Sequence, residues 1–358
     1  MPALTNPSAA ADQLGLDLGL PPLPALAPTK KEPIANRGPA QKATHPKAIR
    51  TLATEQTDYE AIATALDAHD DYKVIRRLKP TLQFPSAPVG AVKRVAILDT
   101  ETTGLSVLSE AIIELALVVV DIDTATGLPV GEVQVFDGFD DPQRPIPAEI
   151  QALTGITDDM VAGQRLDLLA INQIMKGVDW VVAHNAAFDR PFVEQRLPLF
   201  ASLPWACSFA DISWKQLGYG SAKLETLAAH FGWFYDAHRA DMDCHALLAV
   251  LGQSIGDSGQ TGWQHLLAAL VQPQYLLQAT GAPFDAKDYL KLRGYRWDAG
   301  ARVWHTRLGS EAALEAECEW LAQRVYANPR AQVTIVELDA LARYAGRDGK
   351  TSVRSVSA

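Results

Sequence analysis

The chain has 358 residues, of which 48% are hydrophobic and 21% are charged, so it can bury the cores of about two globular units. Its net charge of −10 argues against a protein that coats nucleic acid nonspecifically, although a nuclease with local contacts to nucleic acid is compatible with it. The sequence has no long uninterrupted apolar stretch, no signal-peptide pattern and no pairing pattern among Cys207, Cys244 and Cys318, so we expect a soluble cytoplasmic protein with reduced thiols.

Residues 1–47 are rich in Ala, Pro, Leu and Lys and show no periodicity, so we expect a disordered N-terminal tail. Within it, residues 13–18 resemble the bacterial sliding-clamp-binding motif, and the matching residues are Gln13, Leu14, Leu16 and Leu18. Such a short match also arises by chance in a tail rich in Ala and Leu, so clamp binding is a hypothesis at this point.

Residues 48–88 place apolar side chains at helical spacing, which predicts a helical segment, and Pro80 and Pro85 separate it from the next unit. Residues 93–255 alternate between strand and helix patterns, which predicts an α/β sheet with helices on both faces. The expected strands cover 94–99, 111–121, 131–138, 179–183 and 206–211, and the expected helices lie near 147–153, 167–175, 187–196, 222–231 and 239–253.

Acidic residues accompany apolar runs at three points of this unit. Asp99 and Glu101 end an apolar strand, and residues two positions apart on a strand point to the same face. Because neighbouring carboxylates repel each other, such a pair indicates a divalent-cation site. Asp189 falls in the first turn of a helix, where the helix dipole favours an acid in any case. His238 precedes Asp243 by just over one helical turn, so the two share a face if that helix begins early enough.

Taken together, these segments resemble the three motifs of the DEDDh, or DnaQ-like, 3′–5′ exonucleases, a family that includes the proofreading epsilon subunit of bacterial DNA polymerase III. Asp99 and Glu101 match the first motif, Asp189 the second, and His238 with Asp243 the third. The resemblance implies a ribonuclease H-like mixed sheet flanked by helices. It also implies two divalent cations, Mg²⁺ or Mn²⁺, held by the four acids, with His238 taking a proton from the attacking water.

The same resemblance implies a substrate groove beside the acids. Leu105 and Phe188 would be wedges against the terminal base or sugar. The expected lining of the groove comprises Thr102, Gly104, Leu105, His184, Asn185 and Phe188.

Residues 262–345 are expected to form a separate small α+β module. Its pattern predicts a helix that ends at Gly294, a hairpin that turns at Ala299-Gly300, and an amphipathic helix over 312–326. Residues 346–358 are expected to be a second disordered tail.

Basic residues are interleaved with aromatic residues in this module, a pattern that suits phosphate contact and base stacking. The alternative is that Trp297 and Trp304 form the core that a small hairpin needs; we assign the tryptophans to that core and some of the cations to nucleic acid. The candidate accessory contacts are Lys287, Lys291, Arg293 and Arg296.

The sequence thus predicts a metal-dependent 3′–5′ exonuclease that releases nucleoside 5′-monophosphates from single-stranded or frayed 3′ ends of DNA, in proofreading or repair. An exoribonuclease of the same superfamily is an alternative, because contacts to the 2′-hydroxyl of RNA cannot be read from the sequence. A non-catalytic tether that recruits other proteins to DNA is a second alternative, against which the complete set of catalytic-type residues argues. A dedicated proofreading subunit is a third alternative. The additional C-terminal module and N-terminal helices favour an enzyme that works alone, and a pull-down with a DNA polymerase would decide between them.

Overall fold

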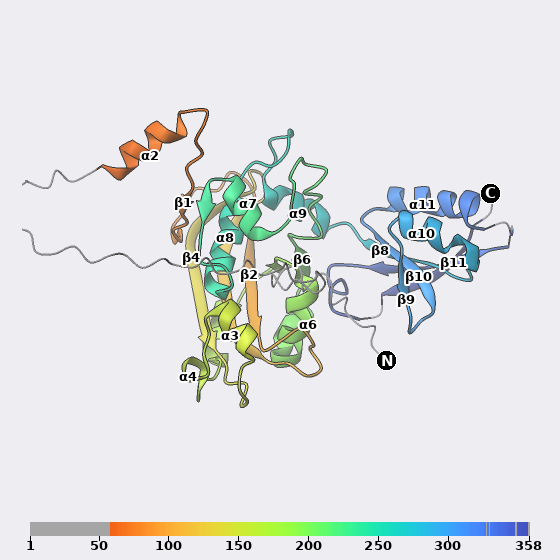
Figure 1. Ribbon diagram of the computed structural model, residues 1–358, viewed down its shortest axis with the longest axis horizontal. Coiled ribbons are helices and arrows are strands. Elements are labelled where there is room, and N and C mark those ends of the chain that lie inside the picture. The colour runs from red at the N-terminus through yellow and green to blue at the C-terminus, as the bar shows by residue number, and fades with distance from the viewer. Residues whose placement is uncertain (1–57, 327, 329, 348, 357–358) are drawn as a thin grey trace, which may run out of the picture. The chain divides into compact units, whose positions relative to one another are not determined.

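The computed structural model describes residues 58–326, 328, 330–347 and 349–356 (Figure 1). The predicted tail over residues 1–47 and the clamp motif within it lie outside these residues. In the described part of the chain, no helix has both the length and the apolar character needed to cross a membrane.

A five-stranded mixed sheet in the order β4-β3-β2-β5-β6 forms the centre of a large domain, residues 75–270 (Figure 1). β2 is antiparallel to β3 and parallel to β5, and β5 is parallel to β6. The strands are β2 (Val92–Thr102), β3 (Ile112–Asp123), β4 (Leu128–Phe139), β5 (Trp180–Ala183) and β6 (Trp205–Cys207). β2 and β3 are mostly buried apolar strands, as expected where helices cover both faces of a sheet.

Successive residues of β2 point into two separate cores. Val95 and Ile97 pack with α7, α8 and α9, whereas Ala96 and Leu98 pack with α5 and α6 on the other face. The helices of this domain are α3 (Ala148–Thr154), α4 (Asp158–Val161), α5 (Leu168–Ile174), α6 (Ala186–Arg196), α7 (Leu224–His230), α8 (Ala240–Leu251) and α9 (Gly262–Leu270). The predicted ribonuclease H-like mixed sheet flanked by helices is therefore confirmed.

Helix α9 belongs to the large domain, although the sequence pattern assigns residue 262 to the C-terminal module. Trp263 of α9 is fully buried, and its ring lies 6.0 Å from that of Trp180 on β5. The hydroxyl of Thr261, which caps α9, donates to the carbonyl of Gly127 at 2.9 Å. Because α9 completes one of the two cores, we place the domain boundary between Leu270 and Gln274.

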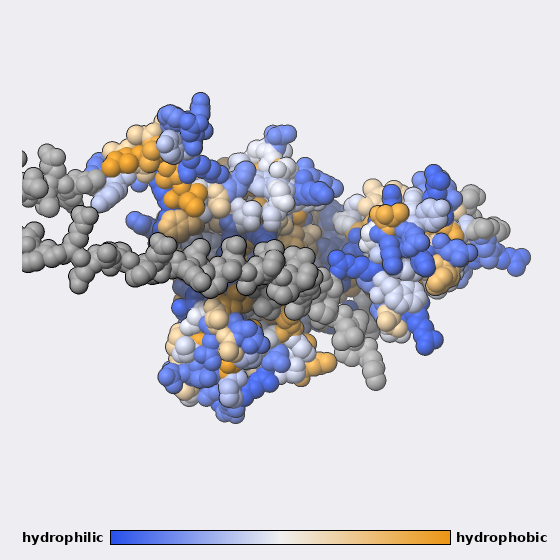
Figure 2. Space-filling model, in the orientation of Figure 1, coloured by the Kyte–Doolittle hydropathy of each residue, from blue (hydrophilic) through white to orange (hydrophobic). Residues whose placement is uncertain are grey.

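The segment before the sheet is less helical than its pattern predicts. Helix α2 (Tyr59–Asp67) is capped by the Asp58 side chain and buries none of its residues, and Figure 2 shows hydrophobic side chains along it. The predicted continuation into a second helical stretch is wrong, because Arg76–Arg77 form strand β1, which runs parallel to β7 (Trp233–Phe234). The buried Leu78 then inserts into the core of the large domain.

Residues 274–356 form a small domain around a second sheet, in the order β12-β11-β8-β10-β9. Its strands are β8 (Gln274–Ala279), β9 (Arg296–Asp298), β10 (Val303–Leu308), β11 (Gln332–Leu338) and β12 (Lys350–Ser355). Helices α10 (Lys287–Leu292) and α11 (Glu311–Arg324) pack on one face of this sheet, where Leu290 and Leu321 meet Leu277. The predicted order of helix, hairpin and helix, and the α+β class, are confirmed.

The prediction of a disordered tail over residues 346–358 is wrong for strand β12, which pairs with β11 from Lys350 to Ser355. The N–H group of the buried Val356 then donates to the carbonyl of Ala331. β12 is a polar edge strand, so its pairing with β11 defines it and its own residue pattern does not. Residues 357–358 lie outside the described part of the chain.

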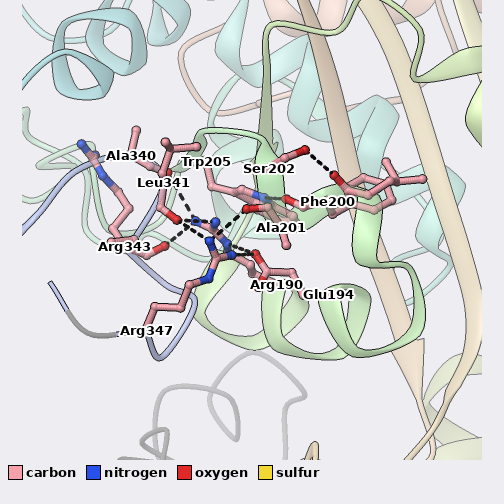
Figure 3. Close-up of polar contacts among 12 residues, drawn as sticks. Arg190, Glu194, Phe200, Ala201, Ser202, Trp205, Ala340, Leu341, Arg343 and Arg347 are labelled. Atoms are coloured by element: carbon pink, nitrogen blue, oxygen red, sulfur yellow. Dashed lines mark hydrogen bonds and ion pairs between the residues drawn. The ribbon is translucent and has the colours of Figure 1, made fainter.

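The β11–β12 connection, residues 339–347, contacts the large domain through the guanidinium group of Arg190 on α6 (Figure 3). Arg190 is fully buried and donates to the carbonyls of Leu341 at 2.7 Å and of Arg343 at 2.6 Å. Its Nε atom donates to Glu194 at 2.6 Å, one turn further along α6. Every part of this buried cation therefore has a partner.

A second buried guanidinium group, that of Arg343, makes the reciprocal contact from the connection to the large domain. It donates to the carbonyls of Ala269 and Gln272 at 3.1 and 2.7 Å, and it forms an ion pair with the fully buried side chain of Asp211 at 3.5 Å. The two buried arginines thus join the small domain to both α6 and the segment that follows β6.

Candidate active site

Acidic side chains converge at the C-terminal end of β2, in the middle of the large domain. Asp99 and Glu101 are 8% and 4% exposed, and Asp243 reaches them from the first turn of α8. One carboxylate oxygen of each of these three residues lies within 4.8 Å of the others. Asp243 is 142 to 144 residues from Glu101 and Asp99 in the sequence, yet the structure brings the three side chains together.

Asp189 joins this cluster from the first turn of α6. Its Oδ1 atom accepts hydrogen bonds from the backbone N–H of Thr100 at 3.2 Å and from the Thr100 hydroxyl at 2.8 Å. Its Oδ2 atom is buried and accepts no hydrogen bond from any described residue. A buried carboxylate oxygen without a donor is costly, so this atom is expected to have a ligand from outside the chain.

The four carboxylates strongly perturb one another. Burial raises the pKa of Asp99 well above its usual value, and the charges of Asp189, Asp243, Glu101 and Glu114 raise it further. Burial is also the main cause that raises the pKa of Asp189 and of Asp243 to about 7. In the described part of the chain no Lys or Arg forms an ion pair with any of the four acids.

These residues fit divalent cations with oxygen ligands. The cluster offers several carboxylate oxygens in a small buried volume, one of which has no partner, and it contains no thiolate that would favour a softer metal. A cation would also remove the repulsion that raises the pKa values. Asp99, Glu101, Asp189 and Asp243 are therefore the residues that could hold divalent cations.

His238 lies in the loop before α8, because that helix begins at Ala240. It therefore does not share a helical face with Asp243 as the spacing suggests; its backbone has φ of 62° and donates its N–H to Asp243 Oδ2 at 2.8 Å. The imidazole is half-buried, and burial lowers its pKa. A lowered pKa keeps the ring neutral near pH 7, which is the form that accepts a proton.

Tyr235 is a site residue that the sequence analysis missed. Its hydroxyl donates to Asp243 Oδ1 at 2.8 Å, so both oxygens of Asp243 accept one hydrogen bond within the chain. Nothing in the local pattern marks Tyr235, because the contact depends on how the loop before α8 folds back.

Glu114 and Arg239 form a buried ion pair that holds the start of α8. Glu114 is fully buried on β3, and it accepts hydrogen bonds from the Arg239 guanidinium at 2.8 Å and from the Ala240 N–H at 2.9 Å. The pair therefore ties the helix that carries Asp243 to the strand next to β2. An acid inside an otherwise apolar strand is the sequence signal that indicates it.

The predicted groove residues fall into two groups. Leu105 and Phe188 are half-exposed, as a contact with substrate requires, and the hydroxyl of Thr102 donates to the carbonyl of Gly104 at 2.7 Å in the loop after β2. His184 is only 3% exposed; its Nδ1 atom bonds the hydroxyl of Ser208 at 2.7 Å, and its buried Nε2 atom has no hydrogen-bond partner among the described residues. Asn185 is also buried, and with φ of 84° it starts α6.

The predicted accessory cations of the small domain differ in their surroundings. Arg293 pairs with Glu317 at 3.0 Å and lies over the ring of Trp320, so it stabilises the domain and its charge is neutralised. Lys287 lies over the ring of Phe284, whereas Lys291 and Arg296 are exposed. Trp304 packs against the core of the domain, as predicted. Trp297 contacts it but is 50% exposed, so it contributes less to that core.

Residues 96–251 match the RNase_T family model, which is described as Exonuclease. The PolC-type DNA polymerase III of Bacillus subtilis (strain 168) is 34% identical over 179 residues, which are 47% of this chain and 12% of the polymerase. The PolC-type DNA polymerase III of Listeria innocua serovar 6a is 42% identical over 100 residues, which are 27% of this chain and 6% of the polymerase.

Among solved structures, Exonuclease X in complex with 5′-overhanging duplex DNA aligns with a TM-score of 0.33 and 26% identity, over 48% of this chain and 97% of that one. The chain spans only a small part, 12% or less, of the two polymerases. Residues 96–251 are therefore similar to an exonuclease family model, and the acids of the predicted DEDDh pattern converge within this segment.

Proposed function

We propose that the exonuclease domain hydrolyses phosphodiester bonds at 3′ ends of DNA and releases nucleoside 5′-monophosphates. The observation that carries the proposal is the cluster of buried acids at the end of β2, where Asp99, Glu101 and Asp243 place oxygens within 4.8 Å of one another and form no ion pair with a described Lys or Arg. Such a cluster is costly to the fold unless it binds a positively charged ligand, and functional sites are where proteins retain that cost.

The four acids would hold two divalent cations, Mg²⁺ or Mn²⁺. The charge of Asp99 interacts with those of the other three acids, so Asp99 would be a ligand together with them. The free Oδ2 atom of Asp189 would be a ligand from the α6 side. Divalent cations supply charge neutralisation at the phosphate and acidify the attacking water.

His238 is the residue suited to take the proton from the attacking water. Its backbone N–H donates to Asp243 Oδ2, so the residue adjoins the cluster, and burial lowers the pKa of the imidazole. A neutral imidazole in a residue that adjoins the acids is suited to the role of general base.

A DNA substrate is favoured by the relatives, because the segment that resembles this domain is part of PolC-type DNA polymerase III chains. We therefore infer a role in proofreading or repair. The half-exposed Leu105 and Phe188 beside the acids would contact the terminal nucleotide. An RNA substrate is the alternative. Binding of the chain to a polymerase or to a sliding clamp would identify the complex in which it works.

Degradation of 5′-labelled single-stranded DNA and RNA of one sequence tests the proposal, in Mg²⁺, in Mn²⁺ and in chelator. Asp243→Asn should abolish the ladder that shortens from the 3′ end. Asp241→Asn is the matched control, since Asp241 lies in the same first turn of α8 but outside the cluster. A ladder that survives in Asp243→Asn or in chelator would contradict the assignment of the metal-dependent active site. A stronger ladder on RNA than on DNA would show that RNA is the preferred substrate.

The clamp hypothesis has a separate test. Deletion of residues 13–18 should remove binding of the full chain to a sliding clamp in a pull-down, while the nuclease ladder stays unchanged. Clamp binding that survives the deletion would show that Gln13, Leu14, Leu16 and Leu18 are a chance match.

A further inference from the structure

The sheet of the small domain has one face on which no helix packs within the described residues. Helices α10 and α11 cover the face that carries Tyr275, Leu277 and Ala279 of β8. The alternate residues of β8, Gln274, Leu276 and Gln278, point to the other face. We call this second surface the open face.

Strand register places Arg296, His305 and Arg307 together on the open face. His305 of β10 pairs with Gln278 of β8 on one side and with Arg296 of β9 on the other. Arg307 lies two residues along β10 and pairs with Leu276. Residues that are directly opposite on neighbouring strands, or two apart on one strand, point to the same side of a sheet.

The two arginines of this group carry charge that the described part of the chain does not neutralise. Arg296 and Arg307 are both exposed, and neither forms an ion pair with a described residue. The nearby carboxylate of Asp298 accepts hydrogen bonds at Oδ1 from the N–H groups of Gly300 and Ala301 and forms no ion pair with either arginine. Burial lowers the pKa of His305, so the positive charge of the open face is that of the arginines.

The open face also has hydroxyl and apolar side chains. The hydroxyls of Thr280 and Thr334 bond each other at 3.0 Å at its edge. Further along the sheet, Val336 is half-buried, and Val353 is 61% exposed. A single-stranded nucleic acid presents regularly spaced anions and unpaired bases, so cations beside apolar groups on an open antiparallel sheet suit its binding.

The open face reaches the contact between the two domains. Gln274, the first residue of β8, donates from its side-chain amide to Asp211 and to the hydroxyl of Tyr344. Asp211 follows β6, and the C-terminal ends of the parallel strands β2, β5 and β6 lie at one edge of the large domain's sheet. The open face is thus joined to the edge of the sheet that carries the acids.

We propose that the open face, through Arg296 and Arg307 next to His305, binds the phosphate backbone of the single-stranded DNA on which the exonuclease domain acts. This inference rests on the proposed function, and it assigns to the small domain a second contact with the substrate outside the active site. The two arginines neutralise phosphates and the half-exposed apolar groups contact bases.

Binding of full-length protein to a fluorescein-labelled single-stranded DNA of about 20 nucleotides, followed by anisotropy in chelator, tests the proposal without hydrolysis. Arg296→Glu with Arg307→Glu should weaken binding about tenfold, and should reduce the dependence of log affinity on log salt by about 1.4, or about 0.7 for each lost phosphate contact. Arg324→Glu with Arg330→Glu is the matched control: these exposed arginines lie at the end of α11 and before β11, and the change in charge is the same.

Hydrolysis of the p-nitrophenyl ester of thymidine 5′-monophosphate in Mn²⁺ separates this proposal from the proposed function. The ester is too small to reach the small domain, so wild type and both double variants should hydrolyse it equally. A wild type that cleaves neither the ester nor DNA would contradict the proposed function, while anisotropy would still decide the role of the open face. Equal DNA binding by the two double variants, or displacement of the DNA by polyglutamate at equal charge, would overturn the proposal.

Discussion

The large domain buries charged groups in two adjacent places, and only one of them has hydrogen-bond and ion-pair partners within the chain. At the end of β2, four carboxylates share a buried volume without a cation, and one oxygen of Asp189 has no partner among the described residues. One residue further along α6, the guanidinium of Arg190 is equally buried, yet Glu194 and the carbonyls of the β11–β12 connection bind it on every side (Figure 3).

The difference shows how to read a buried charge. A buried charge with a complete set of partners holds the fold together, and the cost of desolvating it is offset inside the chain. A buried charge without partners needs a ligand that the chain does not contain, so it indicates function. Changing single residues on each side should therefore affect different properties.

The largest effect is expected for the acids. Asp99→Asn keeps the shape of the side chain but removes a negative charge that interacts with those of the other three acids. Nuclease activity should fall by about 10³-fold or more, as for other residues that act as a unit in catalysis. Thermal stability in chelator should rise, because a repulsive buried charge has been removed. Activity within tenfold of wild type, or a lower melting temperature, would contradict the interpretation of the cluster.

The buried arginine should show the reverse behaviour. Arg190→Met leaves the carbonyl of Arg343 without its donor and removes one of the two arginines that pair with Glu194, so the free energy of unfolding should fall by about 3–5 kcal/mol. Chemical denaturation measures this change. Arg165→Met is the control, because Arg165 is about half-exposed and should contribute less than about 1 kcal/mol. Equal losses in the two variants would show that the contact with the β11–β12 connection is weak.

The pH dependence of stability should come from the acids. Burial raises the pKa of Asp189 and Asp243 from 3.8 to about 7, so the folded chain binds more protons than the unfolded chain between these values. Stability in chelator should therefore decrease as the pH rises from about 4 to about 7, and the decrease should be complete above the folded pKa.

Metal ions should remove this pH dependence. Mg²⁺ or Mn²⁺ binds the ionised acids, so adding either ion at pH 8 should raise the melting temperature more than adding it at pH 5. Asp243→Asn should reduce that difference. A melting temperature in chelator that rises between pH 5 and pH 8, or that responds equally to metal at both values, would contradict the assignment of the metal site.

The smallest effect is expected at Tyr235, which acts through Asp243. Tyr235→Phe removes one hydrogen bond to Oδ1, and a net loss of about 1 kcal/mol would lower activity about fivefold and shift the metal-activation curve to higher concentration. Tyr289→Phe is the control on the exposed surface of α10. If activity falls but the metal dependence stays unchanged, Tyr235 does not position the metal ligand.

The residues of the candidate site could be predicted from the sequence because each motif is local. Asp99 and Glu101 are neighbours on one strand, and Asp189 lies in the first turn of its helix, where short patterns are informative. The tertiary surroundings of other candidate residues could not be predicted in this way. His184 is buried against Ser208, and Arg293 is paired with Glu317 from another helix. The sequence around His184 or Arg293 does not indicate which residue will be its partner.

The sequence by itself determined the α/β class, the order of the main elements of the exonuclease unit and the acidic motifs, because these depend on periodicity and on residue types within a few positions. Only the tertiary structure decided that α9 belongs to the large domain, that β12 is a strand, and that Arg190 binds a connection about 150 residues away. Strand pairing and buried hydrogen bonds join segments that are distant in the chain, and their energy depends on geometry that no local pattern encodes.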